Sequence, residues 1–115
     1  MDFDQLEKFE NALLKKGYKR ITSAKAYQDD DYEYYKTFRD EEGELKYQIF
    51  FEFWDWEQFR KGDGYSVSVT IIPESTKDNV GRRDLQLSVD WTTNIAKVEV
   101  CGEEFYNFIR RIDKM

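Results

Sequence analysis

Apolar residues recur at three- and four-residue intervals near both ends of the chain, which is the period of a helix that buries one side. The first stripe consists of Phe3, Leu6, Phe9, Leu13 and Leu14. Gly17 follows it, and glycine often ends a helix because it adopts the left-handed conformation without strain. The second stripe lies in residues 102–114 and consists of Phe105, Phe108, Ile109 and Ile112. The sequence therefore predicts one helix at each end of the chain.

Between these helices the hydrophobic period shortens to two, which is typical of strands with one buried face. The alternation is poorest in 18–27, which we interpret as an edge strand. In the segment 95–100, the alternation predicts that Ala96, Val98 and Val100 point inward. The predicted strands are 18–27, 32–38, 45–56, 64–72, 84–91 and 95–100.

A sheet of strands with one polar face is covered on one side only, and such sheets are antiparallel. Parallel neighbours would require crossover helices between strands, and the pattern offers none. The two terminal helices can cover the apolar face together. We therefore predict a single α+β domain over residues 1–115. Its architecture is a two-layer sandwich, with an antiparallel five- or six-stranded meander sheet and both helices packed on one face.

The predicted strand 45–56 holds more aromatic side chains than one buried face needs. Its odd positions, Leu45, Tyr47, Ile49, Phe51 and Phe53, form a continuous apolar row that we assign to the core. Its even positions then direct Phe50, Trp54 and Trp56 away from the helices, where Tyr35 of the neighbouring strand can join them. An exposed apolar patch of this kind is typical of an interaction site.

Three other interpretations of these rings stay open. A β-bulge near Phe50 and Phe51 would return the later side chains to the core. The following loop could fold over Trp54 and Trp56. Cross-strand neighbours such as Tyr35, or the aliphatic stems of Lys and Arg, could shield the rings.

The uneven distribution of charge along the chain indicates which kinds of partner it can bind. The chain of 115 residues has a net charge of −6, and residues 29–44 hold eight acids against Lys36 and Arg39, so that this segment alone accounts for −6. Nucleic acids and anionic membranes are bound by basic patches, so we expect no direct nucleic-acid or membrane partner. The acidic segment favours a basic partner, and a charged, solvated hairpin end is the alternative. The candidate acidic residues are Asp29, Asp30, Asp31, Glu41 and Glu42.

The chemistry available to the chain is narrow. It has no histidine, the commonest general base and zinc ligand. Cys101 is its one cysteine, too few for a thiolate metal site and in keeping with a reducing compartment. No phosphate-cradling glycine loop or calcium loop is present. The amino terminus is acidic, and no apolar run is long enough to span a bilayer. We expect a cytoplasmic protein with no enzymatic activity, metal or cofactor.

These observations predict a non-enzymatic protein-interaction module, comparable in size and charge to small acidic inhibitors and immunity proteins. Large rings at the centre of an interface carry most of its binding energy, and charge steers the encounter. Phe50, Trp54, Trp56 and Tyr35 would supply the rings, and the acidic segment would steer a basic protein surface toward them. The alternatives are a module that binds a small ligand and a homodimer that uses the aromatic sheet face.

Overall fold

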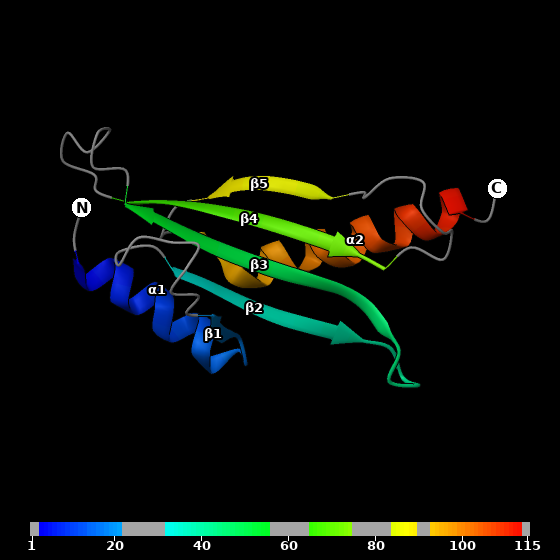
Figure 1. Ribbon diagram of the computed structural model, residues 1–115, viewed down its shortest axis with the longest axis horizontal. Coiled ribbons are helices and arrows are strands. Elements are labelled where there is room, and N and C mark those ends of the chain that lie inside the picture. The colour runs from blue at the N-terminus through cyan, green and yellow to red at the C-terminus, as the bar shows by residue number, and fades with distance from the viewer. Residues whose placement is uncertain (1–2, 22–31, 56–64, 75–83, 90–92, 114–115) are drawn as a thin grey trace.

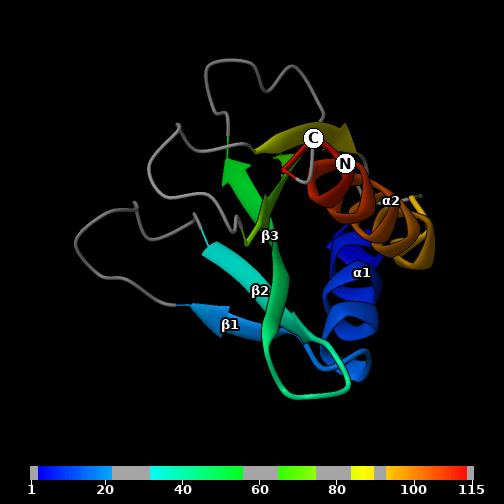
Figure 2. The same ribbon diagram turned by 90° about the vertical axis from the view of Figure 1, so that its right-hand side faces the viewer.

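The computed structural model describes residues 3–21, 32–55, 65–74, 84–89 and 93–113 (Figure 1). Its five strands form one antiparallel sheet in the order β1-β2-β3-β4-β5, and both helices lie on the same side of it (Figure 2). The predicted two-layer α+β sandwich is confirmed. In chain order the elements are α1 (Phe3–Lys15), β1 (Lys19–Ile21), β2 (Tyr32–Arg39), β3 (Leu45–Asp55), β4 (Tyr65–Pro73), β5 (Leu85–Val89) and α2 (Ile95–Asp113).

The sixth predicted strand, 95–100, is wrong, because these residues form the first turns of α2. Their alternation also fits a helix, since Ile95 and Val98 are three residues apart and both are buried. The side chain of Asn94 decides between the two: its Oδ1 accepts the Ala96 amide at 2.9 Å, which is the contact of a helix N-cap. Val100, expected inward, is 56% exposed.

The buried face of α2 is also rotated from the stripe that the sequence suggested. Val98, Gly102 and Tyr106 pack toward the sheet, whereas Phe108 is 49% exposed and Ile112 is 36% exposed. A helix that starts seven residues earlier has its buried face fixed by the earlier apolar positions. The apolar surface of α2 is therefore wider than the part that the sheet covers.

The first helix ends as predicted. Gly17 has a φ of 92°, the Gly17 amide donates to the Leu14 carbonyl at 3.0 Å, and the Tyr18 amide donates to the Leu13 carbonyl at 3.0 Å. These two bonds define a Schellman motif, in which apolar side chains on either side of the turn commonly pack together. Leu13 and Tyr18 are both buried, whereas Leu14 is 50% exposed.

The inner sheet face and the two helices enclose the core. Phe51 lies at its centre, with its ring edge-to-face with those of Phe9 on α1 (5.9 Å) and Tyr18 (5.4 Å). Ile49 and Phe51 are completely buried, which confirms the odd positions of this part of β3 as core. The buried hydrophobic residues are Phe9, Leu13, Tyr18, Tyr34, Tyr47, Ile49, Phe51, Val69, Ile71, Ile95, Val98, Tyr106 and Ile109.

The register of β3 excludes one interpretation of the surplus rings. Its pairing with β4 runs without interruption from Tyr47 to Asp55, and its pairing with β2 is regular through Phe50 and Phe51. The described β2–β3 ladder shifts register between Phe38 and Arg39 instead, beside the hairpin turn. A β-bulge at Phe50 is therefore absent, and the alternation of β3 continues along the strand.

Candidate interaction surface

The sheet face opposite the helices carries an aromatic pair. Tyr35 of β2 and Phe50 of β3 are cross-strand partners, and their rings stack with centroids 6.0 Å apart and an interplanar angle of 21°. Both side chains are half-buried. We call these two residues the outer aromatic pair. Their position follows from strand parity, because Tyr34 and Phe51 next to them point into the core.

Polar rows flank the outer aromatic pair. On one side Gln48 Nε2 donates to Thr37 Oγ1 at 3.1 Å. On the other side Glu33 and Glu52 lie directly opposite each other in the ladder. The pair is thus an apolar patch between a hydroxyl–amide row and a carboxylate row, in which Glu33 is only 9% exposed.

The turn between β2 and β3 displays acidic side chains. Asp40 Oδ1 accepts the amides of Glu42 and Glu44, both at 2.9 Å, and Gly43 has a φ of 83°. These contacts fix the turn and leave Glu41 and Glu42 exposed. Glu41 lies six positions after Tyr35, so the two are at most about 20 Å apart along the chain.

The structure therefore brings together two of the predicted aromatic residues, Tyr35 and Phe50, and places Glu41 and Glu42 at the end of the same hairpin. Trp54 belongs to β3, where its backbone pairs with Ser66. Its side chain lies outside the described part of the structure. Trp56, Asp29, Asp30 and Asp31, together with the loop that could cover the tryptophans, also lie outside the described residues.

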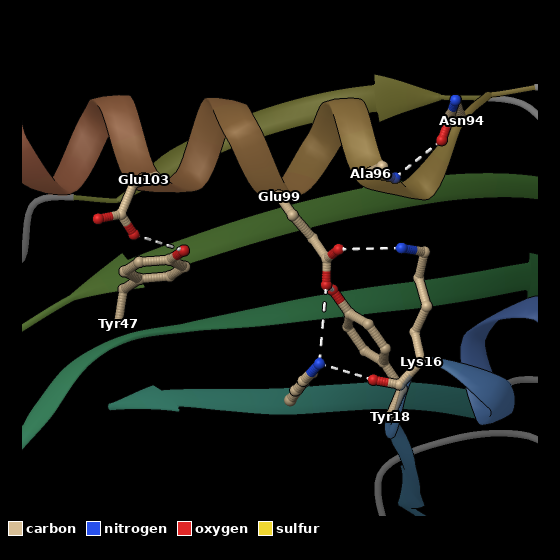
Figure 3. A network of polar contacts seen from close by, with 8 residues as sticks. Lys16, Tyr18, Tyr47, Asn94, Ala96, Glu99 and Glu103 are labelled. Atoms are coloured by element: carbon tan, nitrogen blue, oxygen red, sulfur yellow. Dashed lines mark hydrogen bonds and ion pairs between the residues drawn. The ribbon is translucent and has the colours of Figure 1, made fainter. Parts of the chain in front are cut away.

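The helix side of the sheet carries a polar network that was not predicted from the sequence, and Figure 3 shows the part of it around Glu99 and Glu103. Three buried tyrosines, two on β2 and β3 and one in the connection between α1 and β1, each donate a hydrogen bond from the hydroxyl to a helix glutamate. The contacts are Tyr34 to Glu10 (2.7 Å), Tyr18 to Glu99 (3.1 Å) and Tyr47 to Glu103 (3.0 Å). A signal for them was present, because a tyrosine at an inward strand position needs a partner for its hydroxyl.

Lysines complete this network. Lys16 Nζ donates to Glu99 at 3.3 Å, and Lys46 Nζ donates to both Glu103 oxygens at 2.7 and 2.8 Å. Lys36 projects from β2 to the end of α1, where its Nζ donates to the Lys16 carbonyl at 2.6 Å and lies 3.9 Å from Glu99. A cation at this position also complements the negative end of the helix dipole.

The pKa shifts in this network indicate a structural role and not a role in proton transfer. Burial raises the pKa of Tyr18, Tyr34 and Tyr47 well above the usual tyrosine range, and the hydrogen bonds to glutamate act in the same direction. The hydrogen bond from Lys46 lowers the pKa of Glu103. A general acid or base works best with a pKa near the working pH, and these shifts lead away from neutrality. The network holds both helices against the sheet.

Within the described ranges, no group of three His, Cys, Asp or Glu side chains is placed to hold a metal ion. None of the described helices combines the length and the apolar character needed to cross a membrane. Comparison of the chain with protein-family models, with curated proteins and with solved structures gave no match. What the geometry defines is a two-layer α+β sandwich with an aromatic pair on the sheet face opposite the helices.

Proposed function

We propose that this chain is a non-enzymatic, cytoplasmic protein-interaction module that binds a basic surface of a larger protein through the outer face of its sheet. The observation that carries the proposal is the outer aromatic pair. Tyr35 on β2 and Phe50 on β3 stack on the sheet face that the helices do not cover. A partner that covers this pair would be positioned by the polar rows on either side.

The outer aromatic pair can supply substantial binding energy. A large aromatic side chain buries about 150–250 Å² when it is fully covered. Tyr35 and Phe50 are both partly buried, so on the order of 100 Å² of the two rings together is left to bury, which corresponds to about 2–3 kcal/mol at 25 cal/mol per Å². Loss of translational and rotational freedom opposes this gain. The binding energy of the pair is comparable to that of an interface hot spot, and stable binding also requires contacts around the pair.

The acidic hairpin end argues for a basic partner. Glu41 and Glu42 are exposed and lie within about 20 Å of the pair, inside the span of an interface that covers about 800 Å² per partner. Exposed charges at the rim mainly accelerate the encounter and contribute less to the final affinity. Association should therefore slow as salt screens these charges.

The test is capture of a binding protein from a lysate of the source cells, followed by kinetics with the purified partner. The double variant Tyr35→Ser/Phe50→Ser removes the outer aromatic pair. The matched control Leu14→Ser/Val100→Ser removes two exposed apolar side chains from the helices, which are 50% and 56% exposed. We expect the pair variant to lose binding at least 100-fold while the control binds as the wild type does.

Charge reversal at the hairpin tests the second part of the proposal. Glu41→Lys/Glu42→Lys should lower the association rate severalfold at low salt and leave the dissociation rate nearly unchanged. A partner that binds the pair variant as tightly as the wild type would refute the assignment of this face. Capture of a small molecule in place of a protein would support the ligand-binding alternative.

A further inference from the structure

The two edges of the sheet differ in how they are protected. A strand at a sheet edge presents unpaired backbone groups, and proteins usually block them with charge, proline or a bulge. At one edge, β1 is three residues long and carries Lys19 and Arg20. At the other edge, β5 reads Leu-Gln-Leu-Ser-Val, with no charged residue and no proline. Its ladder with β4 is regular from Leu85 to Val89, so no bulge interrupts it.

The apolar surface continues from β5 onto α2. Leu85, Leu87 and Val89 pack against the core side but are only half-buried. Glu99 and Glu103 face β2 and β3, so the opposite flank of α2 lies toward β5. That flank carries Cys101, Phe105, Phe108 and Ile112 at helical spacing, and all but the half-buried Phe105 are exposed. We call β5 and this flank the β5 edge surface.

The sequence of β5 suits pairing with itself. In an antiparallel pair of identical strands centred on Leu87, Leu87 lies opposite its own copy, Leu85 lies opposite Val89, and Gln86 lies opposite Ser88. Within Leu85–Val89 every apolar side chain then meets an apolar one and every polar side chain meets a polar one, whereas Asp84 and Asp90, which flank this segment in the sequence, add like charges at its ends. The two-fold axis of such a pair is perpendicular to the sheet, so both helix layers stay on the same face.

We propose that the β5 edge surface joins two copies of this chain, with β5 pairing antiparallel to β5 of the second copy about a two-fold axis at Leu87. The two sheets become one sheet, and the exposed flanks of the two α2 helices cover the paired leucines and valines from both sides. This interface is separate from the outer aromatic pair, so it does not depend on the function proposed above.

The size of the surface sets the expected affinity. The 19 residues of α2 span about 28 Å, and a helix layer on a sheet is about 20 Å deep. Two such edges would bury on the order of 1,000 Å² in total, near the lower limit for a specific interface. We therefore expect a dissociation constant in the micromolar range.

The salt dependence separates this contact from partner binding. Each copy has a net charge of −6, and β5 itself is uncharged. Salt screens the repulsion between copies, so dimerisation should tighten as salt rises. Binding to a basic partner should weaken under the same conditions.

The experiment is sedimentation equilibrium from about 2 to 500 µM, in which the mass should rise from 13.9 kDa toward twice that value. Gln86→Lys/Ser88→Lys places two pairs of like charges opposite each other in the proposed register and should raise the dissociation constant by about 5- to 30-fold. Gln86→Lys/Ser88→Glu places opposite charges together and should dimerise at least as tightly as the wild type. Asn11→Lys/Asn107→Lys, at exposed helix positions, matches the first variant in charge and should dimerise normally.

Because Gln86 and Ser88 are exposed, these variants should keep the circular dichroism spectrum of the wild type. Hydrogen exchange gives an independent readout, since the backbone amides of β5 that do not bond to β4 should exchange more slowly as concentration rises. A wild type that remains monomeric at 500 µM would overturn the proposal and leave a strand of another protein as the occupant of this edge. If both charge variants dissociate to the same extent, or if neither dissociates more than the wild type, the proposed register is wrong.

Discussion

Gly102 in the middle of α2 provides the sharpest test of how closely this helix approaches the sheet. A methyl group at this position would lie 3.0 Å from Tyr47 Cε2 and 3.1 Å from Ile49 Cδ1. Neither neighbour can move easily. Ile49 is completely buried, and the Tyr47 ring is stacked on Phe38 at 4.6 Å while its hydroxyl is bonded to Glu103.

Two effects of Gly102→Ala oppose each other. Alanine favours the helix by about 1 kcal/mol relative to glycine, whereas overpacking a tight core costs about 1–3 kcal/mol. Because the neighbouring side chains are fixed, we expect the packing cost to be larger. The variant should lose about 1 kcal/mol in the free energy of unfolding, and its Tm should fall by about 4 °C.

Urea unfolding followed by circular dichroism measures this change in the free energy of unfolding, and two further variants serve as comparisons. Asn107→Ala, at an exposed position of the same helix, gains helix propensity without a new contact and should stabilise the protein by a few tenths of a kcal/mol. Ile49→Val removes one of the two crowded atoms, so its combination with Gly102→Ala should cost less than the sum of the single changes. If Gly102→Ala stabilises the protein as much as Asn107→Ala does, the helix is not held tightly against β3.

Three further changes test the two faces of the sheet. Burial keeps Tyr18, Tyr34 and Tyr47 protonated in the folded protein, whereas unfolded tyrosines ionise near pH 10. Stability should therefore be complete below about pH 10 and fall above it, by at most about 1.4 kcal/mol per pH unit for each tyrosine and less where the hydroxyl meets solvent; an unchanged urea midpoint at pH 11 would contradict this. Lys36→Met keeps the stem but removes the bond to the carbonyl after α1, and should lower the free energy of unfolding by about 1–2 kcal/mol in the same urea assay. Phe50→Ser should cost about 3 kcal/mol because most of its ring is already covered, and a variant that cannot fold would show that this ring belongs to the core.

The elements with a single dominant period were predictable from the sequence. The clean alternation of 64–72 and the C-terminal glycine of the first helix correspond to β4 and to the Schellman motif of α1. Residues 95–100 were mistaken for a strand because β-branched side chains satisfy both periods there. The Asn94 cap was the deciding signal, and Gly102, taken for a helix start, instead allows close packing in mid-helix.

The candidate site was only partly predictable. Strand parity alone places Tyr35 and Phe50 together on one face, because both strands alternate without a break there. The role of Lys36 could not be inferred from its position in an acidic segment, because it depends on where α1 ends in space. The partners of the inward tyrosines likewise come from helices far away in sequence.

The Tyr18–Glu99 contact joins residues 81 positions apart, and the Lys16–Glu99 contact joins residues 83 positions apart. During synthesis on a ribosome, α1 emerges well before Glu99. The hairpins of the meander can form while the chain grows, because their strands are neighbours in sequence. Part of the core, including the buried residues of α2, therefore stays open until α2 has been synthesised. A nascent chain halted before α2 would be a substrate for chaperones.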